Sequence, residues 1–178
     1  MRYLWHSVVH TENIIAMKTL SKIFVVGALI SFVFVSCSVG EDELSLNGPD
    51  FSISDMQGSW EATAALFTTS ENGSQVDQAS IVEDGGSASM IIESSGRFTL
   101  TIAPVGRSSH TVTGNMFFEE ETWFAILFDD YPDDYEYFGV ELTATTLIIN
   151  GGPNTAEYDF EDDGTFEPAN VYLEFVRS

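Results

Sequence analysis

Apolar and polar residues alternate with a period of two along most of the chain after about residue 55. This alternation places apolar side chains on one face of a β-strand and polar side chains on the other. That part of the chain lacks an apolar stripe at helical spacing, so the pattern predicts an all-β domain. The predicted strands cover residues 60–66, 87–93, 97–102, 110–118, 122–128, 135–143, 146–150, 156–160 and 170–177.

Short turns connect most of these strands. Ser94-Ser95-Gly96 is a hairpin linker, whereas the segment 75–83 fits a strand, a loop or a single helical turn. A series of short strands in local hairpins is typical of an up-and-down β-barrel or a β-sandwich, and closure into a barrel removes exposed strand edges. We therefore expect an antiparallel up-and-down β-barrel of about eight to nine strands, with a β-sandwich as the alternative.

The strand 122–128 differs from the others because both of its faces are apolar. One face fills the barrel. The other needs a partner, the membrane or a covering segment such as 75–83, because large apolar patches usually mark contacts. The two sets are Trp123, Ala125 and Leu127 on one face and Phe124, Ile126 and Phe128 on the other.

The N-terminal part of the chain has a continuous apolar run instead of alternation. Residues 23–36 carry no charge, and Lys18 and Lys22 precede them. This run is shorter than the ~20 apolar residues of a transmembrane helix and fits the apolar core of a secretory signal. Because Met17 directly precedes the basic flank, we expect residues 1–16 to be a mis-called extension and residues 17–36 to be the signal peptide.

The only cysteine of the chain, Cys37, stands at the end of this leader, after Phe34-Val35-Ser36. This tetrapeptide resembles the lipobox of bacterial lipoproteins, whose cysteine becomes the lipid-carrying N-terminus. The resemblance implies a secreted protein of the bacterial cell envelope, anchored by the Cys37 lipid to a membrane, in particular the outer membrane, on its periplasmic or external side. Residues 37–54 would then form the lipidated cysteine and a flexible acidic tether, and residues 55–178 the domain.

Two features at the ends of the predicted domain resemble lipocalin-like families. Gly58-Ser59-Trp60 lies at the start of the first strand and matches their Gly-x-Trp signature, and Arg177 ends the last strand. The resemblance implies that Trp60 plugs the closed end of a barrel and that Arg177 packs across it in a cation–π contact. Alternation supports this pairing, because Trp60 and Arg177 lie on the apolar faces of their strands.

A lipocalin-like barrel of about eight strands can hold one small ligand. The side chains that alternation turns inward would form its apolar pocket. These are Ala62, Ala64, Leu66, Met90, Ile92, Phe98, Leu100, Ile102, Leu173 and Phe175, together with Leu147 and Ile149.

Charge narrows the range of partners. The chain has 6 basic and 28 acidic residues; Arg2, Lys18, Lys22 and Glu12 precede Cys37, which leaves 3 basic and 27 acidic residues and a net charge of −24 after the leader. Nucleic acids and anionic surfaces need a basic footprint, so this charge argues against both as partners.

Two acidic segments are candidate cation sites. The segment 159–164 has carboxylates at its first, third and fifth positions and glycine at its sixth, as in the first half of an EF-hand-type calcium loop. Its flanks are predicted strands, and Asn170 stands where a bidentate glutamate belongs, so an acidic hairpin turn is the second interpretation. The second segment, 129–134, is a cation-binding loop or a solvated turn. The candidate calcium ligands are Asp159, Glu161, Asp163 and Glu167.

Catalytic patterns do not stand out. His110 is the only histidine after Cys37, and the chain has no G-x-S-x-G elbow and no glycine-rich phosphate loop. We therefore expect no enzyme, but a lipid-anchored, lipocalin-like module that binds a small apolar ligand. The alternative is a structural or interaction module with a solid barrel, with or without calcium. The oligomeric state stays open.

Overall fold

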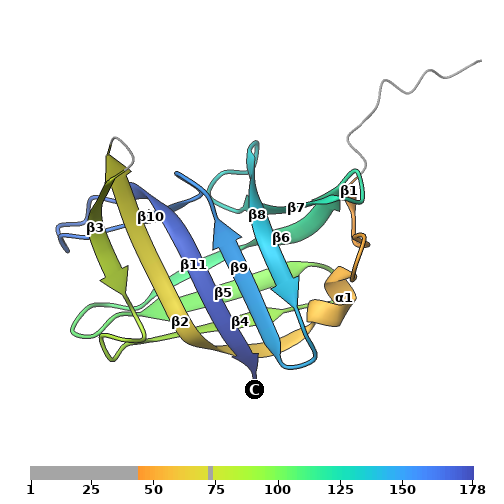
Figure 1. The fold of residues 1–178 in the computed structure, drawn as a ribbon, viewed down its shortest axis with the longest axis horizontal. Helices are drawn as coiled ribbons and strands as arrows, with labels where there is room; N and C mark the ends of the chain where they lie inside the picture. The colour runs from red at the N-terminus through yellow and green to blue at the C-terminus, as the bar shows by residue number, and fades with distance from the viewer. Residues whose placement is uncertain (1–43, 72–73) are drawn as a thin grey trace, which may run out of the picture. The chain divides into compact units, whose positions relative to one another are not determined.

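The computed structural model describes residues 44–71 and 74–178. Within these ranges the chain forms strands and one short helix, in positions close to those that alternation predicts (Figure 1). The elements are β1 (Leu44–Ser45), α1 (Ile53–Met56), β2 (Gly58–Glu71), β3 (Ser74–Ser80), β4 (Ser87–Ile92), β5 (Arg97–Ala103), β6 (His110–Glu119), β7 (Trp123–Phe128), β8 (Tyr135–Leu142), β9 (Thr146–Gly151), β10 (Ala156–Tyr158) and β11 (Glu167–Arg177).

Eight of these strands form a closed antiparallel barrel in the order β2-β4-β5-β6-β7-β8-β9-β11. Closure comes from the first and last of them, because β11 pairs with β2 from Asn170 opposite Thr68 to Arg177 opposite Trp60. The predicted all-β barrel is therefore confirmed, with a lipocalin-like architecture, and the sandwich alternative is wrong because the sheet closes on itself.

Three further strands extend the barrel. β3 pairs with the second half of β2, β10 pairs with the beginning of β11, and β1 pairs with the end of β6. In Figure 1, β3 and β10 lie at one end of the barrel and α1 lies at the other. The sequence allowed a strand, a loop or a single helical turn for the segment 75–83. In the structure this segment contains most of β3, followed by a turn. It pairs with β2, so it is not the predicted cover of β7.

A bulge in β2 changes which of its side chains face the core. Phe175 pairs with Ala62 and Glu174 with Ala64, so Thr63 is an extra residue in β2. An extra residue shifts every later side chain to the opposite face. Trp60 before the bulge is fully buried, and Ala65 and Phe67 after it are 2% and 3% exposed. The prediction that Ala64 and Leu66 point inward is therefore wrong.

The helix α1 covers one end of the barrel. Its first turn is favoured by Ser52, whose backbone N–H and hydroxyl both donate to the Asp55 carboxylate. These hydrogen bonds lower the pKa of Asp55. The apolar side chains of the helix, Ile53 and Met56, are fully buried in the core. This end is therefore closed by packed side chains.

The segment that precedes α1 also packs against the barrel. β1 pairs with β6, and the Phe51 ring meets the Phe118 ring edge-on with centroids 5.5 Å apart. Residues 44–54 were predicted to belong to a flexible tether, but β1 pairs with β6, Phe51 packs on Phe118 and Ile53 is fully buried, so they form part of the barrel's packing. Cys37, the rest of the predicted tether, the predicted signal peptide and the predicted N-terminal extension lie outside the described residues.

Candidate ligand-binding site

The closed end of the barrel is organised around Trp60. The guanidinium carbon of Arg177 lies 4.2 Å from the centroid of the indole ring, and the indole N–H donates to the carbonyl of Met56 at 2.9 Å. Arg177 also donates to the carbonyls of Gln57 at 2.6 Å and Asp55 at 2.9 Å. The contact that the sequence predicted is present, and it joins the last strand to the segment that enters the first.

Gly58 makes room for this contact. Its φ angle is +143°, which side-chain-bearing residues rarely adopt. A Cβ atom at this position would also lie 2.9 Å from the Nη1 atom of Arg177. The glycine of the Gly-x-Trp signature is therefore required by the close approach of the guanidinium group.

The opposite half of the barrel is hollow. A cavity of about 740 Å³ lies between the strands and opens at the end away from Trp60. This volume falls in the range of small-molecule sites, about 300–1,000 Å³. Its apolar wall consists of Phe67, Met90, Phe98, Leu100, Ile102, Val112, Ile126, Phe128, Phe138, Ile149, Val171 and Leu173.

The predicted pocket residues divide into two groups. Met90, Phe98, Leu100, Ile102, Ile149 and Leu173 line the cavity. Ile92, Leu147 and Phe175 point inward but are at most 1% exposed and do not line it, since they belong to the packed closed half. Ala62 packs against the same core, and Ala64 and Leu66 lie on the outer face after the bulge. The structure therefore places the predicted pocket residues of β5 at the cavity together with Met90 of β4, and it places Ile92 of β4 and the predicted residues of β2 away from it.

Several cavity residues were missed by sequence reasoning. Phe67 was missed because only the bulge turns it inward. Ile126, Phe128 and Phe138 lie on β7 and β8, where alternation was readable but the inward face of β7 was ambiguous. The Phe128 ring stands edge-on to Phe98 and Phe138, with centroids 6.2 and 6.3 Å away. An aromatic cluster therefore forms part of the cavity wall.

The mouth of the cavity is polar. The loop after β5 contributes Arg107, the start of β6 contributes His110, and the loop after β7 contributes Tyr131. The Tyr131 hydroxyl donates to the Glu157 carboxylate at 3.0 Å, which connects this loop to β10. The His110 ring lies 5.5 Å from the ring of Phe166. Carboxylates make up most of the remaining charged rim, at Asp130, Asp134, Glu136, Glu157, Asp159 and Asp162.

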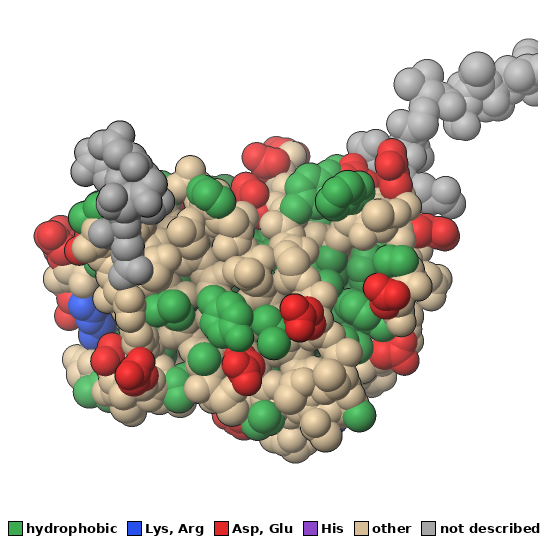
Figure 2. Space-filling view, in the orientation of Figure 1, with side chains coloured by type: hydrophobic (Ala, Val, Ile, Leu, Met, Phe, Trp, Pro, Cys, Tyr) green, Lys and Arg blue, Asp and Glu red, His purple; other side chains and the backbone are tan. Residues whose placement is uncertain are grey.

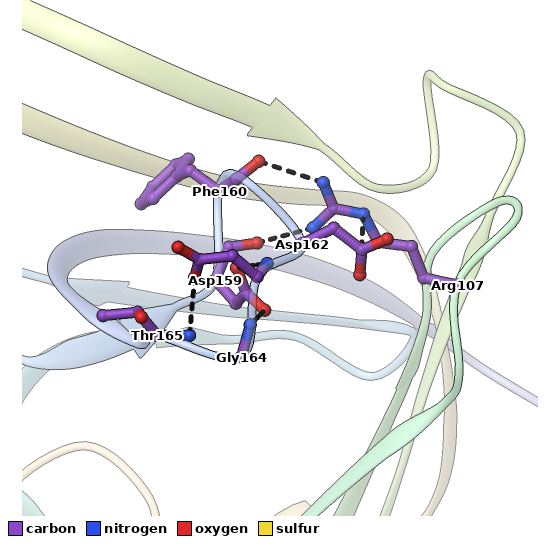
Figure 3. A network of polar contacts seen from close by, with 7 residues as sticks. Arg107, Asp159, Phe160, Asp162, Gly164 and Thr165 are labelled. Atoms are coloured by element: carbon purple, nitrogen blue, oxygen red, sulfur yellow. Dashed lines mark hydrogen bonds and ion pairs between the residues drawn. The ribbon is translucent and has the colours of Figure 1, made fainter.

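Arg107 holds the segment between β10 and β11 at this mouth (Figure 3). Its guanidinium group donates to the carbonyls of Asp159 at 2.5 Å and Phe160 at 2.9 Å, and its Nε lies 3.7 Å from the Asp162 carboxylate. The same group lies 6.0 Å from the ring of Tyr158, which stacks on Phe67 at 4.8 Å. The positive charge of Arg107 thus interacts with carbonyl and carboxylate groups of the protein itself.

The predicted calcium loop forms a turn in which backbone N–H groups donate hydrogen bonds to its own carboxylates. The Asp159 carboxylate accepts hydrogen bonds from the N–H groups of Asp163 at 3.1 Å and Gly164 at 2.8 Å, and Asp163 accepts one from Thr165 at 2.8 Å. Among residues 44–71 and 74–178, no three His, Cys, Asp or Glu side chains come together as metal ligands. Asp159, Glu161, Asp163 and Glu167 are therefore not gathered into one site, and calcium binding stays a prediction.

A second apolar surface lies outside the barrel, on β6 to β8. Trp123 and Tyr137 are 59% and 46% exposed, and their rings lie 6.3 Å apart. The hydroxyls of Tyr135 and Tyr137 both donate to the Glu119 carboxylate, which lowers the pKa of Glu119 and raises that of Tyr135. The outward face of β7 that the sequence marked as apolar is therefore aromatic and partly open to solvent.

Comparison with family models matches none of them, and searches of curated proteins and of solved structures give no significant match. The described residues contain no helix that is both long enough and apolar enough to span a bilayer.

Proposed function

We propose that this protein is a lipid-anchored lipoprotein of the bacterial cell envelope whose barrel binds one small, largely apolar ligand. The observation that carries the proposal is the cavity of about 740 Å³, which is apolar inside, open at one end and plugged by Trp60 at the other. An apolar molecule gains free energy when it leaves water for such a preformed site. The solid-barrel alternative has less support because half of the barrel interior is not filled by side chains.

Filling the cavity tests this proposal. Val112 lines the cavity from β6, whereas Ile91 on β4 is exposed, so Val112→Trp and Ile91→Trp add bulk at matched sites inside and outside the barrel. We expect wild type and Ile91→Trp to carry a co-purified small molecule in native mass spectrometry. Val112→Trp should lose it and should bind a neutral apolar probe such as phenylnaphthylamine at least about tenfold more weakly.

A folded wild-type protein that carries no molecule and binds no apolar probe would overturn the proposed function. Near-ultraviolet circular dichroism of both tryptophan variants checks that each keeps its packed barrel. Equal probe binding by the two variants would place the probe outside the cavity and would also contradict the proposal.

The anchor is tested separately on the full chain in a bacterial host. Cys37 follows the uncharged stretch 23–36, which supports its lipidation after signal cleavage. We expect the wild-type chain to incorporate a labelled fatty acid and to sediment with membranes, and Cys37→Ser to do neither. A wild-type chain without label would contradict the anchor and leave the cavity proposal intact.

A further inference from the structure

The mouth of the cavity carries carboxylates that form no salt bridge with a basic side chain of the described residues. Asp130, Asp134, Glu136 and Glu157 line this mouth. Glu136 also shares the inward face of β8 with Phe138, so its carboxylate stands where the apolar wall ends. Burial, and to a smaller extent the nearby charge of Asp134, raises the pKa of Glu136, because its carboxylate is partly removed from water beside a second acid.

Every arginine in the described ranges is bound to other groups, including Arg107, which lies at the same mouth. Residues 44–71 and 74–178 contain three arginines and no lysine. Arg97 forms an ion pair with Asp129, Arg107 binds the turn after β10, and Arg177 lies across Trp60 at the closed end. The four carboxylates at the mouth therefore lack a basic partner among the described residues.

This arrangement selects ligands by charge. Carboxylates around an opening with apolar walls focus a negative potential there, which attracts cations and repels anions. Tyr131 adds an aromatic ring beside Glu157, and a cation can also interact with the face of such a ring. A bare metal ion fits less well, because no three acidic side chains of the described residues come together as metal ligands.

We propose that the cavity binds amphipathic cations, namely amines whose apolar part enters the barrel and whose positive charge remains at the mouth among Asp130, Asp134, Glu136 and Glu157. This inference rests on the proposed ligand-binding function and names its ligand class. Fatty acids and other anions with apolar tails are disfavoured by the same charges.

Three probes with the same tail and different head groups test the inference. Dodecylamine is cationic, dodecanol is neutral and dodecanoate is anionic at about pH 7. Each is titrated against the purified protein below its micelle concentration, by displacement of phenylnaphthylamine at low ionic strength. We expect dodecylamine to bind at least about tenfold more tightly than dodecanoate, with dodecanol between them, and the difference to shrink as salt is added.

Substitution of two glutamates on β8, one at a time, locates the effect. Glu136 lines the cavity, whereas Glu141 lies on the same strand, exposed and away from it. Glu136→Gln should weaken dodecylamine several-fold and leave dodecanol unchanged, and Glu141→Gln should change neither. If Glu141→Gln weakens dodecylamine as much as Glu136→Gln does, the preference comes from overall charge and the inference about the mouth is wrong.

The possible failures can be told apart. If none of the three probes displaces phenylnaphthylamine, or if the fluorescent probe itself does not bind, the proposed function fails. If dodecanol binds and dodecylamine binds no better than dodecanoate, the cavity function stands and the inference about cations is overturned.

Discussion

Three arginines join parts of the barrel that are distant in sequence, and their contacts differ in chemistry. Arg177 combines a cation–π contact with Trp60 and hydrogen bonds to carbonyls of the preceding segment and of Ala144. Arg107 binds carbonyls at the mouth, and Arg97 pairs with the Asp129 carboxylate. The planar guanidinium fork suits all three arrangements, and a lysine ammonium would reproduce none of them fully.

We expect Arg177→Met to lower the free energy of unfolding by about 1–3 kcal/mol, because it removes a cation–π contact and several carbonyl hydrogen bonds. Arg177→Lys should recover only part of this loss. Arg97→Met is the comparison, since the exposed ion pair that it removes should contribute much less to stability. Urea unfolding followed by tryptophan fluorescence measures all three, and an equal effect of Arg97→Met and Arg177→Met would contradict the special role of the closed end.

The lowered pKa of Asp129 leads us to expect that the stability of the protein depends on pH. Hydrogen bonds from Arg97, and then from Thr113, lower its pKa from 3.8 to about 2. The unfolded chain therefore binds a proton at this site more readily, so the contribution of Asp129 to stability is present above about pH 4 and is lost as the pH falls toward about 2. We expect the stability difference between wild type and Asp129→Asn to shrink over this interval in urea unfolding.

Asp130→Asn is the matched control for this pH dependence. Asp130 is the next residue along the chain, and no salt bridge to it is found in the described residues. Its replacement should leave the acid limb of the wild-type stability curve almost unchanged. A difference for Asp129→Asn that stays constant from about pH 5 to about pH 2 would contradict the lowered pKa.

At the level of elements, the bulge in β2 decides how the cavity is lined. Trp60 must face the closed end and Phe67 must face the cavity, so both point inward although their positions differ by an odd number. Strict alternation cannot satisfy both, and the extra residue Thr63 resolves the conflict. The same strand can therefore plug one half of the barrel and line the other.

The bulge reverses the ranking of two neighbouring substitutions. Phe67→Ala should destabilise the barrel by about 3 kcal/mol because it removes a buried ring, and Leu66→Ala should cost less than about 1 kcal/mol because Leu66 lies on the outer face. Chemical denaturation of both variants measures the difference. A larger effect at Leu66 would mean that side chains alternate without interruption along β2 and that the bulge is absent.

For the whole molecule, charge is the dominant property. From Cys37 onward the chain has 3 basic and 27 acidic residues, a net charge of −24 at neutral pH. In Figure 2, acidic side chains are spread across the visible face of the barrel, with apolar side chains between them. Such a surface keeps a protein soluble and lowers the stability of its compact state through self-repulsion.

Added salt should therefore stabilise this protein. Because a Debye length shortens from about 30 Å at 0.01 M to about 10 Å at 0.1 M salt, sodium chloride screens the repulsion between surface carboxylates. We expect the melting temperature to rise by several degrees over this interval at neutral pH, measured by circular dichroism. The same titration near the isoelectric pH is the control, and a melting temperature that falls with salt at neutral pH would show that attractive pairs outweigh repulsion.

Most of the fold could be predicted from the sequence. The strands from β4 to β9 follow from alternation and short turns, because side-chain period and turn chemistry are local properties. Gly58, Trp60 and Arg177 could be assigned to one end because they lie at the limits of the first and last barrel strands. The part of the site on β4 and β5 followed from the same alternation, with Met90, Phe98, Leu100 and Ile102 in the cavity.

The rest depended on contacts between distant parts of the chain. The pairing of β2 with β11 joins residues more than a hundred positions apart, and it sets the bulge and therefore the inward side chains of β2. Register and strand tilt decide which inward residues fill the closed half and which line the cavity, since alternation gives a face and not a depth. The sequence by itself determined the strands, the plug and the negative charge. Only the tertiary structure brought carboxylates from the loop after β7, from β8 and from β10 to one mouth, because that proximity depends on barrel closure and not on sequence spacing.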